Sequence, residues 1–327
     1  MSLPVNQIIQ GDCRDTLPTL PDNSVDCCVT SPPYWGLRDY GVDGQLGLEK
    51  TPQEYVQGMV DVFTQVYRVL KPEGTLWLNL GDSYASGGRG INEHLVQKMG
   101  NKQASAQALG AKRPAPGLKD KDLVGIPWRV AFALQEYGWY LRQDIIWHKP
   151  NPMPESVRDR CTKAHEYIFL LSKSRKYYFD QEAIKEESID PIGKHRGGSL
   201  IKAARGEKGD SKVAWHNHGG SEESLYSDGK ANKRSVWSVA TRPYKDAHFA
   251  TFPPELITPC ILAGCPKDGI VLDPFMGSGT TAEVAYKLGR NYIGCELNPA
   301  YIELGRAEAA KQNLTVSELK QGQMSLL

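Results

Sequence analysis

Residues 270–281 read Ile-Val-Leu-Asp-Pro-Phe-Met-Gly-Ser-Gly-Thr-Thr, and this stretch decides the fold class. Its apolar start predicts a buried strand over 270–272, and Gly277 and Gly279 predict a tight turn. The hydroxyl residues that follow predict a helix over 279–288, after which come a strand over 291–295 and a helix over 300–311. A strand that returns to a second strand through a helix is the unit of a parallel sheet.

The same alternation extends through the rest of the chain. Short apolar runs rich in β-branched residues predict strands over 5–10, 25–29, 75–80, 140–147 and 166–171. Apolar residues recur with a period near 3.6 over 53–70, which predicts an amphipathic helix stopped by Lys-Pro-Glu-Gly at 71–74; a further helix is predicted over 123–137. We therefore expect an α/β fold with a largely parallel sheet covered on both faces.

Two stretches interrupt this pattern, at 85–122 and 185–238. Both are far longer than ordinary connections, whose median is about 4 to 6 residues, so we interpret them as functional insertions. This gives a first part of one domain at 1–184, which contains the basic insertion 85–122, and a separate insertion at 185–238. The second part of the domain follows at 239–315, and a tail follows at 316–327.

Composition excludes several classes of protein. The formal net charge is +1, so any surface that binds a polyanion must be a local patch. Seven cysteines without a CxxC pair predict neither a disulfide framework nor a metal site. The sequence shows no signal peptide and no membrane span, and a reducing cytoplasm is the expected location.

The glycine turn also predicts a ligand. Glycine lets the backbone approach a ligand closely, and the free N–H groups at the helix start, with Thr280 and Thr281, can bind a carboxylate. Glu296 ends the next strand about twenty residues after the glycines, the spacing at which an acid reaches ribose hydroxyls. Together with Asp273, it favours a nucleoside with an amino-acid tail, such as S-adenosylmethionine. A phosphate-binding loop would need a lysine that is absent here, whereas a dinucleotide dehydrogenase also fits this segment taken alone.

A second motif, Thr-Ser-Pro-Pro-Tyr-Trp at 30–35, follows a predicted strand. The two prolines stiffen the loop, and we expect its carbonyls to point outward unpaired and, with the Ser31 hydroxyl, to accept hydrogen bonds from a base amino group. Tyr34 offers an aromatic face for an unstacked base, and Trp35 would extend it. The alternative is that these residues form only a rigid surface turn. The presence of this motif together with the predicted cofactor motif favours a catalytic role. The expected catalytic residues are Ser31, Pro32, Pro33 and Tyr34.

The order of the two motifs resembles that of the beta group of S-adenosylmethionine-dependent DNA amino methyltransferases, the cytosine-N4 and adenine-N6 family. The resemblance extends to Gly-Asp at 11–12, and to the segments 68–74, 78–84, 147–154 and 248–254. It implies a Rossmann-like methyltransferase fold with a seven-stranded, mostly parallel sheet. The order of the strands along the chain would be circularly permuted: the chain would begin with the family's third strand and finish with the first two. This order predicts that the two termini lie close together in space.

The resemblance also assigns roles to individual residues. Asp12 would approach the adenine of S-adenosyl-L-methionine and Glu296 its ribose. The methionine part would be held by Asp273, Phe275, Gly277 and Gly279, and residues 248–251 would line the same pocket. The predicted cofactor-binding residues are Asp12, Asp273, Phe275, Gly277, Gly279, Thr280, Thr281, Glu296, His248, Phe249 and Thr251.

The target base is indicated by the first residue of the catalytic motif. In the family that the chain resembles, Ser-Pro-Pro-Tyr usually accompanies cytosine N4 and Asp-Pro-Pro-Tyr usually accompanies adenine N6. Ser31 therefore favours cytosine, whereas hydrogen bonding alone does not separate the bases, since Ser or Asp can accept from either amino group. Adenine-N6 methylation is the alternative. More remote alternatives are an RNA or protein amide methyltransferase and a nucleotide-binding module without catalysis.

The expected partner is double-stranded DNA, and the 185–238 insertion is the expected recognition segment. Its arginines and lysines could contact phosphates and guanine edges, although single charges of this kind are more often solvated. A homodimer would suit a palindromic target. The candidate DNA-binding residues are Lys112, Arg113, Lys194, Arg196, Lys202, Arg205, Lys233 and Arg234.

Overall fold

A computed structural model of the chain describes residues 3–37, 41–85, 116–187, 230–241 and 252–303. The chain divides into two compact units, one made of residues 1–179 and 235–327 and the other of residues 180–234. The second unit overlaps the predicted recognition insertion at 185–238, whose role stays a prediction. Its described part contains a 3-10 turn, η2 (Glu182–Ile184), and an antiparallel pair of short strands, β6 (Glu186–Glu187) and β7 (Lys230–Ala231).

The first unit is built on one sheet, which has eight strands in the described residues, in the order β1-β10-β9-β2-β3-β5-β4-β8. Only β5 runs opposite to the others, since it pairs antiparallel with both β3 and β4. The predicted α/β fold with a mostly parallel sheet is confirmed, with one strand more than the seven expected because three residues of β8 add to the edge beside β4. The strands are β1 (Gln7–Gln10), β2 (Val25–Thr30), β3 (Leu70–Leu80), β4 (Tyr140–His148), β5 (His165–Ser172), β8 (Val236–Ser238), β9 (Ile270–Asp273) and β10 (Asn291–Glu296).

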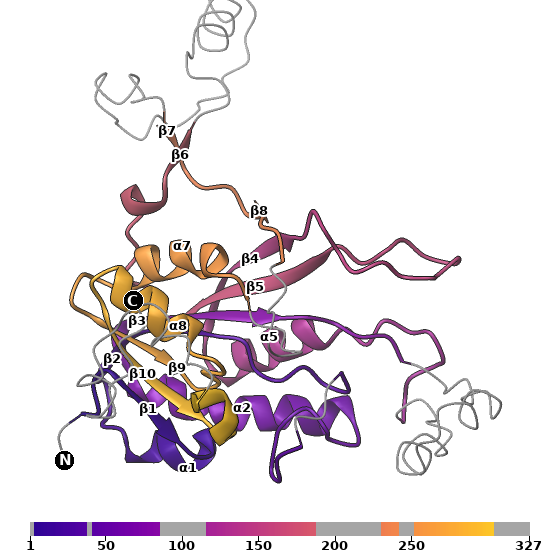
Figure 1. The fold of residues 1–327 in the computed structure, drawn as a ribbon, viewed down its shortest axis with the longest axis horizontal. Helices are drawn as coiled ribbons and strands as arrows, with labels where there is room; N and C mark the ends of the chain where they lie inside the picture. The colour runs from indigo at the N-terminus through magenta and orange to yellow at the C-terminus, as the bar shows by residue number, and fades with distance from the viewer. Residues whose placement is uncertain (1–2, 38–40, 86–115, 188–229, 242–251, 304–327) are drawn as a thin grey trace, which may run out of the picture. The chain divides into compact units, whose positions relative to one another are not determined.

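Helices cover both faces of this sheet (Figure 1). On one face α1 (Cys13–Thr16), α2 (Pro52–Val69) and α5 (Ile126–Tyr137) share one apolar cluster with the strands, and η1 (Leu17–Thr19) continues α1. On the other face lie α7 (Pro254–Gly264) and α8 (Thr280–Lys287), which pack on each other. The close approach of α7 to β3 requires Gly264, because a Cβ there would lie 2.3 Å from Trp77 Nε1.

Two elements differ from the prediction. Strand β3 begins at Leu70 rather than at residue 75, because the segment after α2 pairs directly with β2, Leu70 opposite Val25, and the Lys71 ammonium contacts the Asp26 carboxylate at 2.7 Å. Helix α7 was not predicted. It contains an internal proline, Pro259, and most of its side chains are buried, so it lacks the one-sided apolar period that indicates a helix.

The permuted strand order is confirmed. The glycine-loop strand β9 and its successor β10 come last in the described chain, yet β9 lies in the middle of the sheet between β10 and β2. Strand β1 pairs with β10, so the first and last strands are neighbours. The predicted closeness of the termini themselves concerns residues outside the described ranges. No described helix is long and apolar enough to cross a membrane.

Strand register brings the functional motifs to one edge of the sheet. Gln10 pairs with Glu296, Gly294 with Asp273, and Thr30 with Leu78, so the carboxyl ends of these strands are aligned. The residues that follow them meet at that edge, together with Glu166 at the start of the antiparallel strand β5. Ligands of open parallel sheets bind at this edge.

Candidate active site

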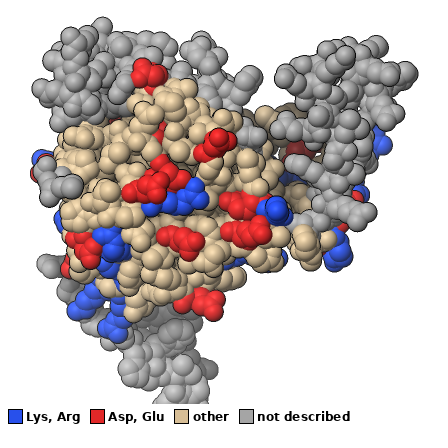
Figure 2. All heavy atoms as spheres, turned by 90° about the horizontal axis from the view of Figure 1, so that it is seen from below, with Lys and Arg blue, Asp and Glu red and all other residues tan. Residues whose placement is uncertain are grey.

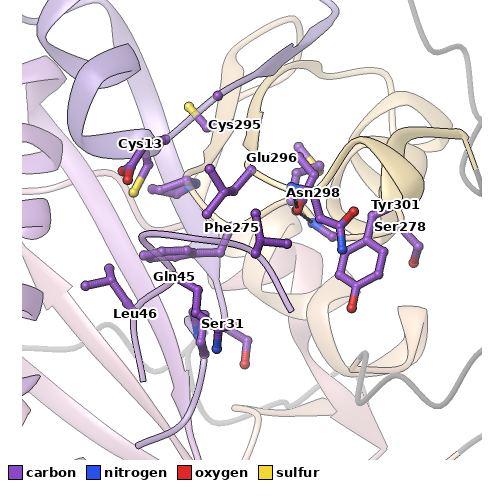
Figure 3. A pocket seen from close by; sticks show the side chains of 18 of the residues that line it. Cys13, Ser31, Gln45, Leu46, Phe275, Ser278, Cys295, Glu296, Asn298 and Tyr301 are labelled. Atoms are coloured by element: carbon purple, nitrogen blue, oxygen red, sulfur yellow. Dashed lines mark hydrogen bonds between the residues drawn. The ribbon is translucent and has the colours of Figure 1, made fainter. Parts of the chain in front are cut away.

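A pocket lies at the carboxyl edge of the sheet, where the glycine loop, the end of β1 and the Ser-Pro-Pro-Tyr loop meet. Figure 3 shows Ser31 and Gln45 on one side of it and Ser278, Asn298 and Tyr301 on the other. Of the predicted cofactor and catalytic residues, the pocket brings together Asp12, Ser31, Pro33, Phe275, Gly277, Thr280 and Glu296.

Glu296 is held in place by the backbone around it. Its Oε2 accepts a hydrogen bond from Gly277 N and its Oε1 from Asn298 N, each at 2.7 Å. Burial raises the pKa of this carboxyl above its ordinary value, although the two N–H donors oppose the rise. Each carboxylate oxygen keeps a second lone pair, so Glu296 can still accept hydrogen bonds from a ligand's vicinal hydroxyls.

The glycine loop leaves room for a ligand. Gly277 has φ of 57°, and a Cβ added there would meet no atom within 4 Å. Gly279 has φ of 95° and precedes α8, whose first residue, Thr280, lines the pocket. Backbone in this left-handed region favours glycine, and its N–H groups can approach a ligand without side-chain interference.

Asp12 lies at the end of β1 and caps α1, with its Oδ1 accepting from Arg14 N at 2.8 Å. Burial alone would raise the pKa of Asp12, but the Arg14 guanidinium and backbone N–H outweigh it and hold the pKa below its ordinary value. Arg14 Nη2 also donates to Gly44 O at 2.7 Å. Asp12 is therefore ionised, and Arg14 connects it to the loop that contributes Gly44 to the pocket.

Asp273 has a different position from the one predicted, because it lies behind the pocket lining and is only 1% exposed. Its carboxylate accepts hydrogen bonds from Thr30 Oγ1 at 2.5 Å, Thr281 Oγ1 at 2.6 Å and Phe275 N at 3.0 Å. Burial raises its pKa to about 6, against the effect of these three donors. Asp273 and Thr281 thus join the glycine loop to the catalytic loop, and neither lines the pocket.

The catalytic loop is only partly as expected. Ser31 and Pro33 line the pocket, and Pro32 is buried. The expectation that the loop's carbonyls are unpaired is wrong for Pro33, whose carbonyl accepts a hydrogen bond from the Tyr55 hydroxyl at 2.8 Å. Tyr55 belongs to α2, so the helix that packs on the sheet also fixes the position of this loop.

Tyr34 is anchored rather than free. Its hydroxyl donates to Glu166 Oε2 at 2.7 Å and lies 3.1 Å from Asn79 Oδ1, and Ser31 Oγ donates to it at 3.3 Å. One side of the ring contacts Gly81, where a Cβ would lie 2.5 Å from Tyr34 Cε2. The orientation of Tyr34 therefore depends on residues in and next to β3 and β5 to which the sequence analysis gave no role.

Like Tyr34, Trp35 lies outside the pocket lining, and its predicted role in extending the aromatic platform stays a prediction. It packs against the apolar cluster, and its indole N–H donates to Glu49 O at 2.9 Å. Its role here is to join the catalytic loop to the segment that follows it.

Several pocket residues were not predicted. Most of them come from the segment after the catalytic loop and from the segment after β10, whereas Phe252 precedes α7 and Ser278 belongs to the glycine loop. Only the glycines at 41, 44 and 47, which mark turns, gave a sequence signal for the first of these segments. The unpredicted lining residues include Val42, Gln45, Leu46, Phe252, Ser278, Asn298 and Tyr301.

Many predicted DNA-binding positions lie outside the described residues, as do three cofactor positions. Of the DNA candidates, Lys233 and Arg234 are described, and both pair with Glu186, Lys233 at 3.8 Å. Their charge is thus partly neutralised within the second unit. The positions outside the described residues are Lys112, Arg113, Lys194, Arg196, Lys202, Arg205, His248, Phe249 and Thr251.

Known proteins match both the sequence and this geometry. A family model described as DNA methylase matches residues 25–307. The chain belongs to this DNA methylase family. The methylase is 47% identical over 298 residues to the Type II methyltransferase M.Cfr9I of Citrobacter freundii, a match that covers 91% of this chain and 85% of that protein. It is 48% identical over 301 residues to the Type II methyltransferase M.SmaI of Serratia marcescens, covering 92% and 89%.

Solved structures share the fold of the methylase. The PvuII DNA methyltransferase (cytosine-N4-specific) superimposes with a TM-score of 0.59 at 18% identity, covering 96% of this chain and 89% of that one. A putative DNA modification methylase of Thermus thermophilus, solved in complex with S-adenosyl-L-methionine, gives a TM-score of 0.54 at 22% identity, covering 94% and 96%. The predicted family is confirmed, and S-adenosyl-L-methionine is its methyl donor. The described residues contain no group of three or more potential metal ligands.

Proposed function

We propose that this DNA methylase transfers a methyl group to the N4 amino nitrogen of a cytosine within duplex DNA, at a specific sequence. One observation carries the proposal: Ser31, at the end of β2, lines the same pocket as Glu296 and Gly277. A hydrogen-bond acceptor for an amino group and a site suited to a nucleoside with an amino-acid tail therefore share one cavity. Such proximity is what a direct transfer between two bound groups requires.

The pocket residues fit S-adenosyl-L-methionine. Glu296 would accept the ribose hydroxyls, Phe275 and Leu46 offer apolar surface to the adenine, and the N–H groups after Gly277 would meet the methionine carboxylate. When bound, the cofactor would supply a sulfonium-bound methyl group: the amino nitrogen would bond the methyl carbon while the S–C electron pair stays on sulfur, so that S-adenosylhomocysteine leaves and the nitrogen gives up one proton to water. Asp273 acts indirectly, by holding the glycine loop and Thr30 together.

Ser31 is the protein group placed to act on the base. An amino nitrogen conjugated with the ring is a weak nucleophile, and accepting one of its hydrogens at Ser31 Oγ favours the pyramidal geometry needed for attack. The same argument applies to the amino group of adenine. The preference for cytosine rests on Ser rather than Asp at this position, as in the family resemblance. The PvuII enzyme, named as cytosine-N4-specific, shares the fold, but the fold alone does not distinguish the two bases.

The DNA would approach the carboxyl edge of the sheet, with the target base turned out of the duplex to reach Ser31. Figure 2 shows the face below Figure 1, where acidic and basic side chains are intermixed among the coloured residues and form no continuous basic patch. That face is unsuited to a polyanion, in agreement with the net charge of +1. The recognition segment proposed for this chain is residues 185–238.

Methyl transfer from tritium-labelled S-adenosyl-L-methionine to unmethylated mixed-sequence DNA, followed by nucleoside mass spectrometry, tests the proposal. We expect N4-methylcytosine in DNA treated with the wild-type protein and none with Ser31→Ala. N6-methyladenine would overturn the choice of base but keep the family activity. Unlabelled DNA alongside labelled RNA or protein would overturn DNA as the substrate.

A further inference from the structure

We infer that Glu166 and Lys149 are positioning residues for the transfer, because they fix the direction of the hydrogen bonds that end at Ser31. This inference deepens the proposed function and rests on it. The four side chains form what we call the Ser31–Lys149 network: Ser31 donates to Tyr34, Tyr34 donates to Glu166, and Glu166 is paired with Lys149. The network spans the ends of β2, β4 and β5.

The Lys149–Glu166 ion pair decides which groups of the network donate hydrogen bonds and which accept them. Glu166 Oε1 accepts from Lys149 Nζ, and the two side chains are 14% and 18% exposed, so the pair is largely removed from water. Lys149 Nζ also lies 4.2 Å from the centre of the Trp147 ring, a cation–π contact that holds the ammonium in place. A carboxylate paired in this way can only accept hydrogen bonds. The Tyr34 hydroxyl has two acceptors within reach, Glu166 Oε2 at 2.7 Å and Asn79 Oδ1 at 3.1 Å, and its hydrogen points to Glu166 because the nearer, charged oxygen is the stronger acceptor.

The Tyr34 hydroxyl in turn decides where the Ser31 hydrogen points. Desolvation of the phenol and the neighbouring Glu166 carboxylate raise the pKa of Tyr34 well above its ordinary value, so the phenol keeps its hydrogen. With that hydrogen committed at 2.7 Å to Glu166, the phenol oxygen can only accept from Ser31, at 3.3 Å. The Ser31 hydrogen then points away from the pocket, which leaves the lone pairs of Oγ to accept a hydrogen of the base amino group.

The surroundings of Tyr34 show that its position is strictly defined. The ring lies against Gly81, with no room for a Cβ, and Asn79 Oδ1 is 3.1 Å from the hydroxyl. Asn79 Nδ2 itself donates to Tyr167 O at 3.0 Å, which fixes the orientation of that amide. These contacts come from the ends of β3 and β5, so the pairing of these two strands fixes the position of the Tyr34 hydroxyl.

Two substitutions break the network in different ways. Tyr34→Phe keeps the ring and removes the hydroxyl. Glu166→Gln keeps the shape, but its amide oxygen would turn to Lys149 and its NH₂ to Tyr34, whose own hydrogen would move to Asn79 Oδ1. The phenol oxygen would then accept from two donors, which weakens its hold on the Ser31 hydrogen. For each variant we expect single-turnover transfer to fall about 10- to 100-fold, with cofactor Kd and DNA KM changed less than about threefold. Because Glu166 acts through Tyr34, the double variant should be no slower than the slower single variant.

Glu155→Gln is the matched control. Glu155 lies in the same β4–β5 connection and pairs with Arg160 at 2.6 Å, outside the network. Its effect on rate, whatever the size, should be the same in the wild-type and in the Tyr34→Phe background. If Glu166→Gln slows transfer equally in the two backgrounds, or changes only the melting temperature, the network has no role in positioning. Total methyl transfer is measured here whichever base is modified, so a wrong choice of base would not affect this test.

Discussion

The glycine-loop region and the catalytic-loop region lie at the same edge of the sheet but are held together in different ways. Around the glycine loop, Glu296 bonds Gly277 N and Asn298 N, and Asp273 bonds Phe275 N and Thr281, all within nineteen residues in sequence. Around the catalytic loop, Tyr34 bonds Glu166, 132 residues away, and Thr30 bonds Asp273, 243 residues away. The cofactor side is thus a local structure, whereas the catalytic side depends on the assembled sheet.

The largest effect that separates the two regions is expected at Ser31. Ser31→Ala should lower single-turnover methyl transfer by about 10²- to 10³-fold, because it removes the acceptor for the amino group in the transition state. Cofactor Kd, measured by calorimetry, should change less than about threefold, since Glu296 and the glycine loop are unaltered.

Ser24→Ala is a suitable control for that change. The Ser24 hydroxyl donates to Pro21 O at 2.7 Å beside the opposite end of β2, so its removal should leave both transfer and cofactor binding within about twofold of wild type. A Ser31→Ala enzyme that loses cofactor affinity and transfer to the same extent would show that the two regions are not separable.

The same contrast explains what sequence analysis could predict. Helix α2 and the strand, turn and helix around Gly277 depend on local patterns, and their predicted bounds agree with the structure to within two residues. Glu296 was identified by its spacing from the glycines. Asp273 was placed at the correct strand end but assigned to the ligand, because sequence spacing cannot show that Thr30 and Thr281 already occupy its oxygens.

Residues that act across the sheet gave no local signal. Glu166, Asn79 and Gly81 become partners of Tyr34 only once β3 and β5 pair. The family resemblance covers Asn79 and Gly81 within 78–84 but gives neither a role, and no pattern marks Glu166. Leu46 and Gln45 enter the pocket because their loop folds back over the catalytic loop, where Gly36 N donates to Gly47 O at 2.8 Å. Such contacts require the tertiary fold.

The link between the regions can be tested at Asp273. Its folded pKa, about 6, lies above its ordinary value of 3.8, so its contribution to stability is fully present below about pH 3.8 and is lost as pH rises through 6. Relative to Asp273→Asn, which does not titrate, wild type should lose about 2 to 3 kcal/mol of unfolding free energy between pH 4 and 7. Urea denaturation across this range measures the difference, and parallel pH profiles would contradict it.

A smaller effect, confined to the cofactor side, is expected for Glu296→Gln. Either orientation of the amide directs its NH₂ at a backbone N–H, of Gly277 or of Asn298, so one buried donor loses its acceptor. Cofactor Kd should rise about 10- to 30-fold, and transfer at saturating cofactor should stay within about threefold. Glu283→Gln, whose carboxylate pairs with Lys287 on α8, should leave both values unchanged. A loss of rate at saturation would place Glu296 in the chemical step.

The smallest effect concerns Arg14, which connects the cofactor side to the loop beside the catalytic motif by donating to Gly44 O at 2.7 Å. Its side chain is 43% exposed, so Arg14→Ala should weaken cofactor binding only about two- to fivefold at pH 8. Arg14→Ala keeps the backbone N–H that bonds Asp12 but removes the guanidinium, so burial would raise the pKa of Asp12 from its lowered value. The loss of affinity should therefore increase as the pH falls and Asp12 becomes protonated. Arg142→Ala, which removes an arginine that contacts Tyr177, should show neither effect. A pH-independent loss in Arg14→Ala would mean that Arg14 acts through Gly44 alone.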